Sequence, residues 1–191
     1  DMHMLGAMFA PTDDLTLMLM TSYKAFEMDH GIFPGAPAML INAVGGDTFT
    51  TRSEGIGDTK LSALYTVYRN ENRKLHGGLG LSLPTGSITE RDATPRPAMP
   101  PTFESQQLPA SMQLGSGTYD LLPSLTYVAH HDKIAYGLQS SAIIRLQDAN
   151  DQDYRLGHRF ETNTWISYLF QPAFSLSTGL RYRYEGKLKG A

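Results

Sequence analysis

The sequence predicts an all-β fold, because eight segments of the chain alternate apolar and polar residues with a period of two. The connections between these segments are short and long in strict alternation, and aromatic residues gather near both kinds of connection. In an outer-membrane β-barrel one strand face meets lipid, the other meets a polar interior, and tight periplasmic turns alternate with extended outer loops. The pattern therefore predicts an antiparallel up-and-down transmembrane β-barrel, with eight strands in this chain.

The first four predicted strands form two hairpins. In chain order they are Met2–Phe9, Leu15–Phe26, Asp58–Val67 and Leu75–Leu83. Short turns at Pro11–Asp14 and Asn70–Arg73 join the members of each pair. Alternation is least clean in the first pair, because methionine stands on its polar side.

The last four predicted strands form two more hairpins. They are Thr118–Tyr127, Ile134–Leu146, His158–Phe170 and Phe174–Tyr184. Turns at His130–Lys133 and Gln171–Ala173 are too short for a parallel crossover, so each pair is antiparallel. The final strand alternates most clearly, with Leu180 and Tyr182 on one face and Arg181 and Arg183 on the other.

Aromatic placement separates a membrane barrel from a soluble β-sandwich or a lipocalin-like barrel. One band lies near the short turns and comprises Phe9, Tyr65, Tyr127, Tyr136, Tyr168, Phe170 and Phe174. A second lies near the long connections and comprises Tyr23, Tyr119, Phe160, Tyr182 and Tyr184. Aromatic residues also favour strands in soluble proteins, but two bands on one face are typical of the girdles of a membrane barrel.

Three long connections run roughly over residues 27–56, 89–116 and 148–156. The first two are rich in Gly, Pro, Asp and Thr, which predicts solvent-exposed outer loops. The second cannot hold a central strand, because prolines crowd into it at positions 95, 97, 100, 101 and 109.

Composition excludes several classes of protein. The 191 residues fit one domain, and the absence of cysteine excludes disulfides, thiolate metal sites and a cysteine nucleophile. A net charge of −3 gives no electrostatic reason to expect nucleic acid as a partner. No apolar run approaches the roughly 20 residues of a membrane helix. The mean hydropathy of −0.28 is compatible with a membrane barrel, since half of each strand is polar.

Strand direction predicts that the intact barrel extends beyond these residues. With short turns in the periplasm, the first strand runs inward from the outer face and the last runs outward to it. Bacterial barrels have an even strand number and normally leave both termini in the periplasm. We therefore expect terminal strands outside this chain and ten to twelve strands in the intact barrel. Asp1 is not an initiator residue, and export requires a signal peptide, so a mature or truncated portion is expected.

Polar residues on the inward face are candidates for lining the lumen and setting its selectivity. They are Lys24, Asp58, Lys60, Asp120, Gln139, Arg145, Arg159, Glu161, Arg181, Arg183 and Glu185. The charged members fall towards the long-loop ends and form a mixed-charge belt at the outer mouth. Rings of fixed charge select and orient solutes in channels. The alternative is that the same groups form cross-strand ion pairs that fill a narrow interior.

Methionine forms a second candidate site on the first two strands. Met4, Met8, Met18 and Met20 are predicted to face inward, with His3 near the outer end. Thioether and imidazole ligands favour copper, whereas methionine also fills gaps as a flexible hydrophobe. We expect no cofactor, and a copper ion bound by these residues is the alternative. No nucleophile motif or phosphate cradle is present, because Gly115-Ser-Gly117 lacks a following helix, so we expect no enzyme.

Four motifs in order resemble a known family. They are Gly55-Ile-Gly-Asp-Thr-Lys-Leu61, Gly78-Leu-Gly-Leu-Ser-Leu-Pro-Thr-Gly86, Leu114-Gly-Ser-Gly-Thr-Tyr-Asp-Leu-Leu-Pro-Ser-Leu-Thr-Tyr127 and Tyr154-Arg-Leu-Gly-His-Arg-Phe-Glu161. Together they resemble the outer-membrane transporters of the MetA-pathway of phenol degradation family, and the Met- and His-rich opening resembles one branch of it. The resemblance implies a barrel that passes small, aromatic compounds, and it supplies no catalytic or binding residues.

The resulting expectation is a bacterial outer-membrane channel for passive passage of small, aromatic or hydrophobic solutes. Its partners would be the lipid bilayer and a small-molecule solute, with the oligomeric state left open. Two alternatives remain open: a copper-binding or export-linked barrel with a methionine-lined lumen, and a plugged structural protein of the outer membrane.

Overall fold

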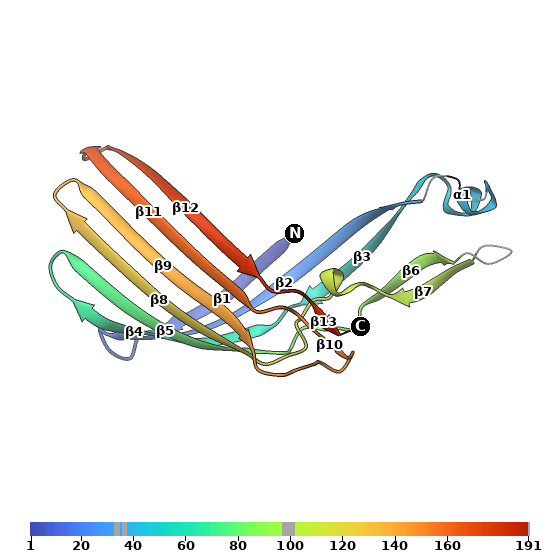
Figure 1. The fold of residues 1–191 in the computed structure, drawn as a ribbon, viewed down its shortest axis with the longest axis horizontal. Coiled ribbons are helices and arrows are strands. Elements are labelled where there is room, and N and C mark those ends of the chain that lie inside the picture. The colour runs from blue at the N-terminus through green and yellow to red at the C-terminus, as the bar shows by residue number, and fades with distance from the viewer. Residues whose placement is uncertain (33–34, 36–37, 97–101, 191) are drawn as a thin grey trace. The chain divides into compact units, whose positions relative to one another are not determined.

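The computed structural model describes residues 1–32, 35, 38–96 and 102–190. Its main element is a nine-stranded antiparallel sheet with the order β1-β2-β4-β5-β8-β9-β11-β12, and β3 pairs with β2 (Figure 1). The long strands are β1 (Met2–Phe9), β2 (Leu15–Gly31), β3 (Thr48–Ile56), β4 (Thr59–Arg69), β5 (Arg73–Leu83), β8 (Asp120–His131), β9 (Ile134–Arg145), β11 (Arg159–Gln171) and β12 (Phe174–Glu185). This all-β, up-and-down strand order confirms the predicted fold class, and all eight predicted strands are present.

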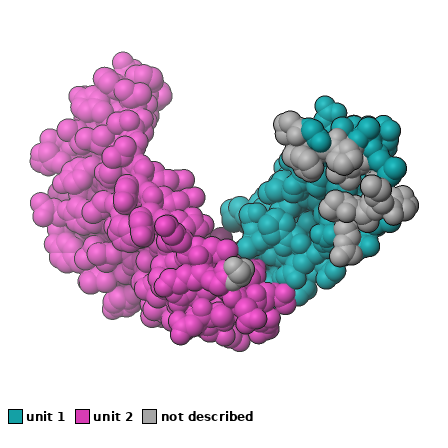
Figure 2. Space-filling view, turned by 45° about the vertical axis from the view of Figure 1, so that its right-hand side comes forward, with its two compact units in different colours: residues 1–4, 21–58, 85–117 teal, residues 5–20, 59–84, 118–191 magenta. Residues whose placement is uncertain are grey.

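The chain divides into two compact units, coloured separately in Figure 2. Unit 1 comprises residues 1–4, 21–58 and 85–117, and unit 2 comprises residues 5–20, 59–84 and 118–191. Within the described residues, no helix has the length and apolar composition needed to cross a bilayer.

The sheet of unit 2 has one apolar face, on which large side chains remain exposed. The register places Leu61 opposite Leu81, Leu81 opposite Leu121, and Leu121 opposite Ile144, so apolar residues line up across neighbouring strands. Four leucines that the core of a soluble protein would bury are exposed instead. Their exposed fractions are 58% for Leu79, 52% for Leu125, 46% for Leu138 and 71% for Leu180. We call this surface the apolar face.

The opposite surface of unit 2, the polar face, carries Asp120, Gln139, Arg145, Glu161 and Arg183 among others. These residues alternate with the apolar set, because successive side chains of a strand point to opposite sides. Within the described strands, β1 and β12 stand at the two ends of the order and do not pair with each other.

The hairpin turn between β8 and β9 is shorter than the sequence indicates. Strand β8 continues through His131, so the expected four-residue turn at His130–Lys133 reduces to Asp132 and Lys133. Asp132 has a φ of 49°, the left-handed conformation that two-residue hairpins require.

Unit 1 contains regular structure where the sequence predicts a loop over residues 27–56. Strand β2 continues to Gly31 and pairs with β3 from Tyr23 opposite Ile56 to Gly31 opposite Thr48, and α1 (Ala38–Val44) lies between them. The threonine-rich run Thr48–Thr51 favours this extension, because β-branched residues suit strands.

The connection over residues 89–116 also differs from the expected solvent-exposed loop. It holds a two-stranded hairpin of β6 (Arg91–Arg96) and β7 (Thr102–Gln107), followed by the 3₁₀ turn η1 (Ala110–Met112). Pro95 stands in β6 and Pro109 directly precedes η1, whereas Pro97, Pro100 and Pro101 lie outside the described residues. No central strand forms there among the described residues, in agreement with the proline content.

Burial in unit 1 concentrates on the segment that follows β7. Leu108, Met112 and Leu114 are buried, and the hydroxyl of Ser53 on β3 donates to the Met112 carbonyl at 2.6 Å. The expectation of solvent exposure is therefore wrong for Leu108 and for residues 112–116, because three apolar side chains in a polar stretch provide a small core of their own. In unit 2, the connection over residues 148–156 adds β10 (Tyr154–Arg155), which pairs with β13 (Lys189–Gly190).

Candidate functional site

The candidate site is the charged end of the polar face of unit 2. Strands β8 and β11 begin there with Asp120 and Arg159, and β9 and β12 end there with Arg145 and Glu185. The register brings oppositely charged residues together across strands. Asp120 lies opposite Arg145, Glu161 opposite Arg183, and Arg159 opposite Glu185.

Asp120 and Arg145 form a buried ion pair. Their side chains are 3% and 6% exposed, and Arg145 Nη1 donates to Asp120 Oδ2. The Thr118 hydroxyl donates to the other carboxylate oxygen at 2.7 Å. The backbone amide of Arg145 donates to Nδ1 of His158 at 3.1 Å, which joins the end of β9 to the residue before β11. This group fixes the start of β8 against the end of β9.

Glu161 lies between two arginines of β12. Arg183 Nε donates to Glu161 Oε2 at 2.9 Å, and Arg181 Nε lies 3.5 Å from Glu161 Oε1. Asn163 donates to the same carboxylate at 3.2 Å and accepts from Arg181 Nε at 2.9 Å. The carboxylate of Glu161 thus interacts with two guanidinium groups.

The remaining candidates of unit 2 have simpler surroundings. Arg159 Nη2 donates to Glu185 Oε1 at 3.0 Å, and Gln139 Nε2 donates to Thr126 Oγ1 at 3.2 Å. Lys60 is exposed and lies opposite Ser82 on β5. Cross-strand ion pairing, one of the two sequence interpretations, thus describes the geometry of most charged residues on this face.

Lys24 and Asp58 belong to unit 1, where each holds a loop segment. Lys24 Nζ donates to the Leu114 carbonyl at 2.6 Å. Asp58 accepts from the backbone amides of Gly86 at 3.1 Å and Ser116 at 2.8 Å. Both side chains position the segments around residues 85–90 and 108–117.

The methionines share one face of the first hairpin, but His3 does not join them. A Cβ placed on Gly6 would lie 3.4 Å from Met20 Cγ, so the even-numbered residues of β1 and β2 lie on a common side. His3 alternates to the other side of β1, away from Met4. Among the described residues, no group of three or more His, Cys, Asp or Glu side chains is placed to hold a metal ion.

Sequence analysis missed Trp165, the single tryptophan of the chain. It lies on β11 opposite Gly137 of β9 and Gly179 of β12. A Cβ on Gly137 would overlap the indole ring, so glycine leaves room for the ring to lie over the neighbouring strand. The sequence shows one tryptophan and a glycine in each neighbouring strand. That these three residues lie opposite one another is apparent only once the strand register is known.

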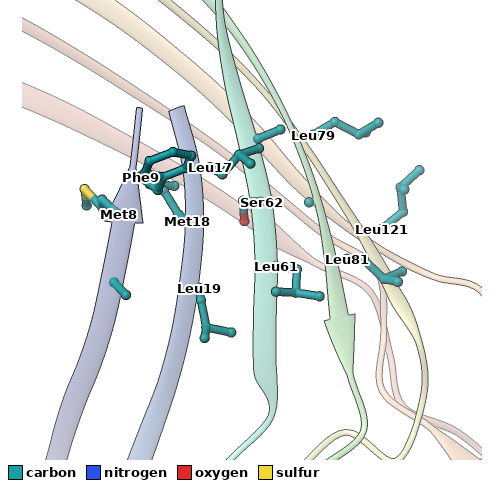
Figure 3. A pocket seen from close by; sticks show the side chains of 13 residues that line it. Met8, Phe9, Leu17, Met18, Leu19, Leu61, Ser62, Leu79, Leu81 and Leu121 are labelled. Atoms are coloured by element: carbon teal, nitrogen blue, oxygen red, sulfur yellow. The ribbon is translucent and has the colours of Figure 1, made fainter. Parts of the chain in front are cut away.

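The apolar face carries an open depression of about 670 Å³, shown in Figure 3. Its lining combines Phe9 of β1, Leu17 and Leu19 of β2, Leu61 of β4 and Leu79 of β5 with their neighbours. It is almost wholly apolar, in contrast to the charged end of the polar face.

No model of a protein family matches the chain, and no curated protein matches it by sequence. One similar solved structure is the crystal structure of an outer membrane channel from Pseudomonas putida F1. It has 19% sequence identity and a TM-score of 0.58, over 99% of this chain and 61% of that chain. At this identity the likeness shows the fold alone, an antiparallel sheet of up-and-down β-barrel type. The chain spans about 61% of the channel's length.

Proposed function

We propose that this chain forms most of the wall of an outer-membrane channel for small solutes. The observation that carries the proposal is the division of the unit 2 sheet into an exposed apolar face and a charged polar face. A soluble monomer rarely exposes so large a continuous apolar surface, whereas a membrane barrel turns such a surface to lipid. The fold likeness to an outer membrane channel supports the same assignment.

Aromatic side chains at the tight-turn end support the bilayer as the partner of the apolar face. Tyr168 and Phe170 pack edge to face at 4.7 Å between ring centroids, and Phe170 and Phe174 lie 5.4 Å apart. All three rings are exposed. Amphipathic and aromatic rings gather at the level of the lipid headgroups in membrane barrels.

The proposal includes barrel closure through further strands. Backbone groups at the edges of β1 and β12 require partners in hydrocarbon, because no water is present there to satisfy them. An intact barrel of ten to twelve strands would pair both edges and enclose the polar face. The lumen of a barrel of that size is narrow, which favours small solutes.

For the solute, we propose more specifically aromatic or hydrophobic compounds. This choice comes from the resemblance to the phenol degradation family. Trp165 adds a stacking surface on the polar face beside the charged residues, which suits a flat ring.

Conductance in planar lipid bilayers tests the channel directly. Insertion of the folded protein should give discrete current steps in potassium chloride, and liposomes that contain it should swell in arabinose but not in a large dextran. A protein that inserts into vesicles, acquires heat-modifiable gel mobility and yields neither signal would contradict the channel. That result would favour a plugged structural barrel.

A further inference from the structure

Charge on the polar face of unit 2 is unbalanced in favour of cations. Towards the loop ends of the described strands this face holds five cationic side chains and three carboxylates. They are Lys60, Arg145, Arg159, Arg181 and Arg183, against Asp120, Glu161 and Glu185. Asp120 and Glu185 each pair with one arginine. The uncompensated positive charge therefore lies at Lys60 and at the two arginines around Glu161.

The two arginines beside Glu161 have unused hydrogen-bond donors. Arg181 bonds to Asn163 through Nε, and Arg183 bonds to Glu161 through Nε. In the part of the chain that the structure describes, their terminal Nη atoms make no hydrogen bond. The side chains are 65% and 48% exposed, whereas Glu161 is only 18% exposed. The carboxylate is thus more covered than the two guanidinium groups, which lie on the last strand of the sheet order.

This geometry suits an incoming carboxylate. Arg181 and Arg183 are two residues apart on β12, so they share a face at a spacing of about 7 Å along the strand. A guanidinium fork binds a carboxylate with two parallel hydrogen bonds, and those bonds are strengthened by charge. A second carboxylate would also balance the positive charge that Glu161 leaves uncompensated.

Trp165 lies on the same face as this pair of arginines, and its indole ring lies over Gly137 of β9. Asn163, the partner of Arg181, is two residues from Trp165 on the same face of β11. The indole ring is therefore an aromatic group on the same face as the arginines, across β11 from them.

We propose that Arg181 and Arg183 form a binding site for small carboxylate solutes on the polar face. The inference rests on the proposed channel, for which it names the solute class: organic anions, with benzoate as the simplest aromatic member. The other charged groups near the site on this face are Glu161, Arg159 and Glu185. Glu185 lies two residues from Arg183 on β12, and its carboxylate is paired with Arg159.

Binding is measured on the folded protein in detergent, independently of transport. Sodium benzoate should change the fluorescence of Trp165 in a saturable manner, and benzamide, its neutral analogue, should not. The single variants Arg181→Gln and Arg183→Gln should each weaken benzoate binding roughly tenfold, the equivalent of one charge-assisted hydrogen bond. The matched control Lys133→Gln removes a positive charge at the tight turn and should leave binding unchanged.

Arg181→Lys keeps the charge but lacks the fork, so it should restore only part of the affinity. Each variant is accepted only if heat-modifiable mobility shows that it folds, and the two glutamine variants provide independent tests. Equal binding of benzoate and benzamide, or unchanged benzoate binding in both glutamine variants, would overturn the site.

Bilayer recordings then separate the site from the channel. In a potassium chloride gradient, the reversal potential should show a preference for anions, and Arg181→Gln should reduce it. Benzoate binding without any conductance would retain the site and remove the channel. Conductance with cation preference and no benzoate binding would retain the channel and remove the site.

Discussion

At the scale of single residues, the Asp120–Arg145 pair is the interaction most sensitive to change. Both side chains are buried, and Thr118 satisfies a second oxygen of the carboxylate. Removing one partner of a buried pair leaves the other charge without compensation, whereas an exposed pair contributes little. The exposed Arg159–Glu185 pair on the same face provides the comparison.

We predict that Asp120→Asn lowers the free energy of unfolding by about 3–5 kcal/mol, because Arg145 remains buried without a counter-charge. Glu185→Gln should lower it by less than about 1 kcal/mol, because solvent screens that pair. Urea unfolding of the protein in lipid vesicles, followed by Trp165 fluorescence, measures both values. Equal losses for the two variants would contradict the assignment of a buried pair at Asp120.

The sequence predicts which side a residue faces more readily than which residue it contacts. Alternation alone places Glu161, Arg181 and Arg183 on a common face, and the structure agrees. Their mutual contacts depend on the register between β11 and β12, which also brings Asn163 to Arg181. Burial of Asp120 depends on Thr118 and Arg145, and the alternation pattern contains no information on depth within the end of a barrel.

At the scale of elements, the segment from Leu108 to Gly117 behaves as a packed part of unit 1. Gln113 donates to the carbonyls of Leu108 and Glu90, and Glu90 donates its amide to the Gln113 side chain at 2.9 Å. Met112 packs on β3, where Thr51 donates to its sulfur at 3.3 Å. These contacts explain why a connection without long strands remains buried.

We predict that Met112→Ala loosens this segment, because it removes the most buried side chain of a small core. Local stability should fall by about 2–5 kcal/mol, the usual range for methionine to alanine in a core. Hydrogen exchange of the amides of residues 108–117 should accelerate accordingly. Phe103→Ala changes an exposed residue of β7 and serves as the control, since exchange in this segment should not respond to it. Unchanged exchange in Met112→Ala would contradict the packed segment.

The two long connections show where sequence patterns are insufficient at this scale. Residues 27–56 are rich in loop-forming types, yet five of the nine residue pairs between β2 and β3 have both partners in this stretch. Strand pairing outweighs local propensity because each strand supplies the other's backbone partners. In the second connection, Leu108, Met112 and Leu114 are too few to form a periodic pattern, so their burial follows from tertiary contacts alone.

At the scale of the whole molecule, the division into two faces is the property that the sequence predicts best. A period of two persists through each hairpin, and antiparallel register carries it from strand to strand. Leu138 and Thr164 are opposite each other, and Thr164 is opposite Leu180, so the same face continues across β9, β11 and β12. The sequence therefore determines which surface is apolar, and in the proposed channel that surface would meet lipid. The choice of solute in that proposal depends on a few side chains and their pairing.

Adjacent residues of β9 give a direct test of the lipid-facing surface. Leu138 and Gln139 lie on opposite faces near the middle of the strand. Arginine at a lipid-facing position near the bilayer midplane costs about 2–4 kcal/mol, whereas the polar interior of a barrel accepts it more readily. Leu138→Arg should thus lower the free energy of unfolding in phospholipid vesicles by about that amount, and Gln139→Arg should change it much less. In a soluble fold, arginine at the half-exposed Leu138 would reach water and cost little. A larger loss for Gln139→Arg than for Leu138→Arg would therefore reject the lipid-facing assignment of the apolar face, and with it the membrane location of this sheet.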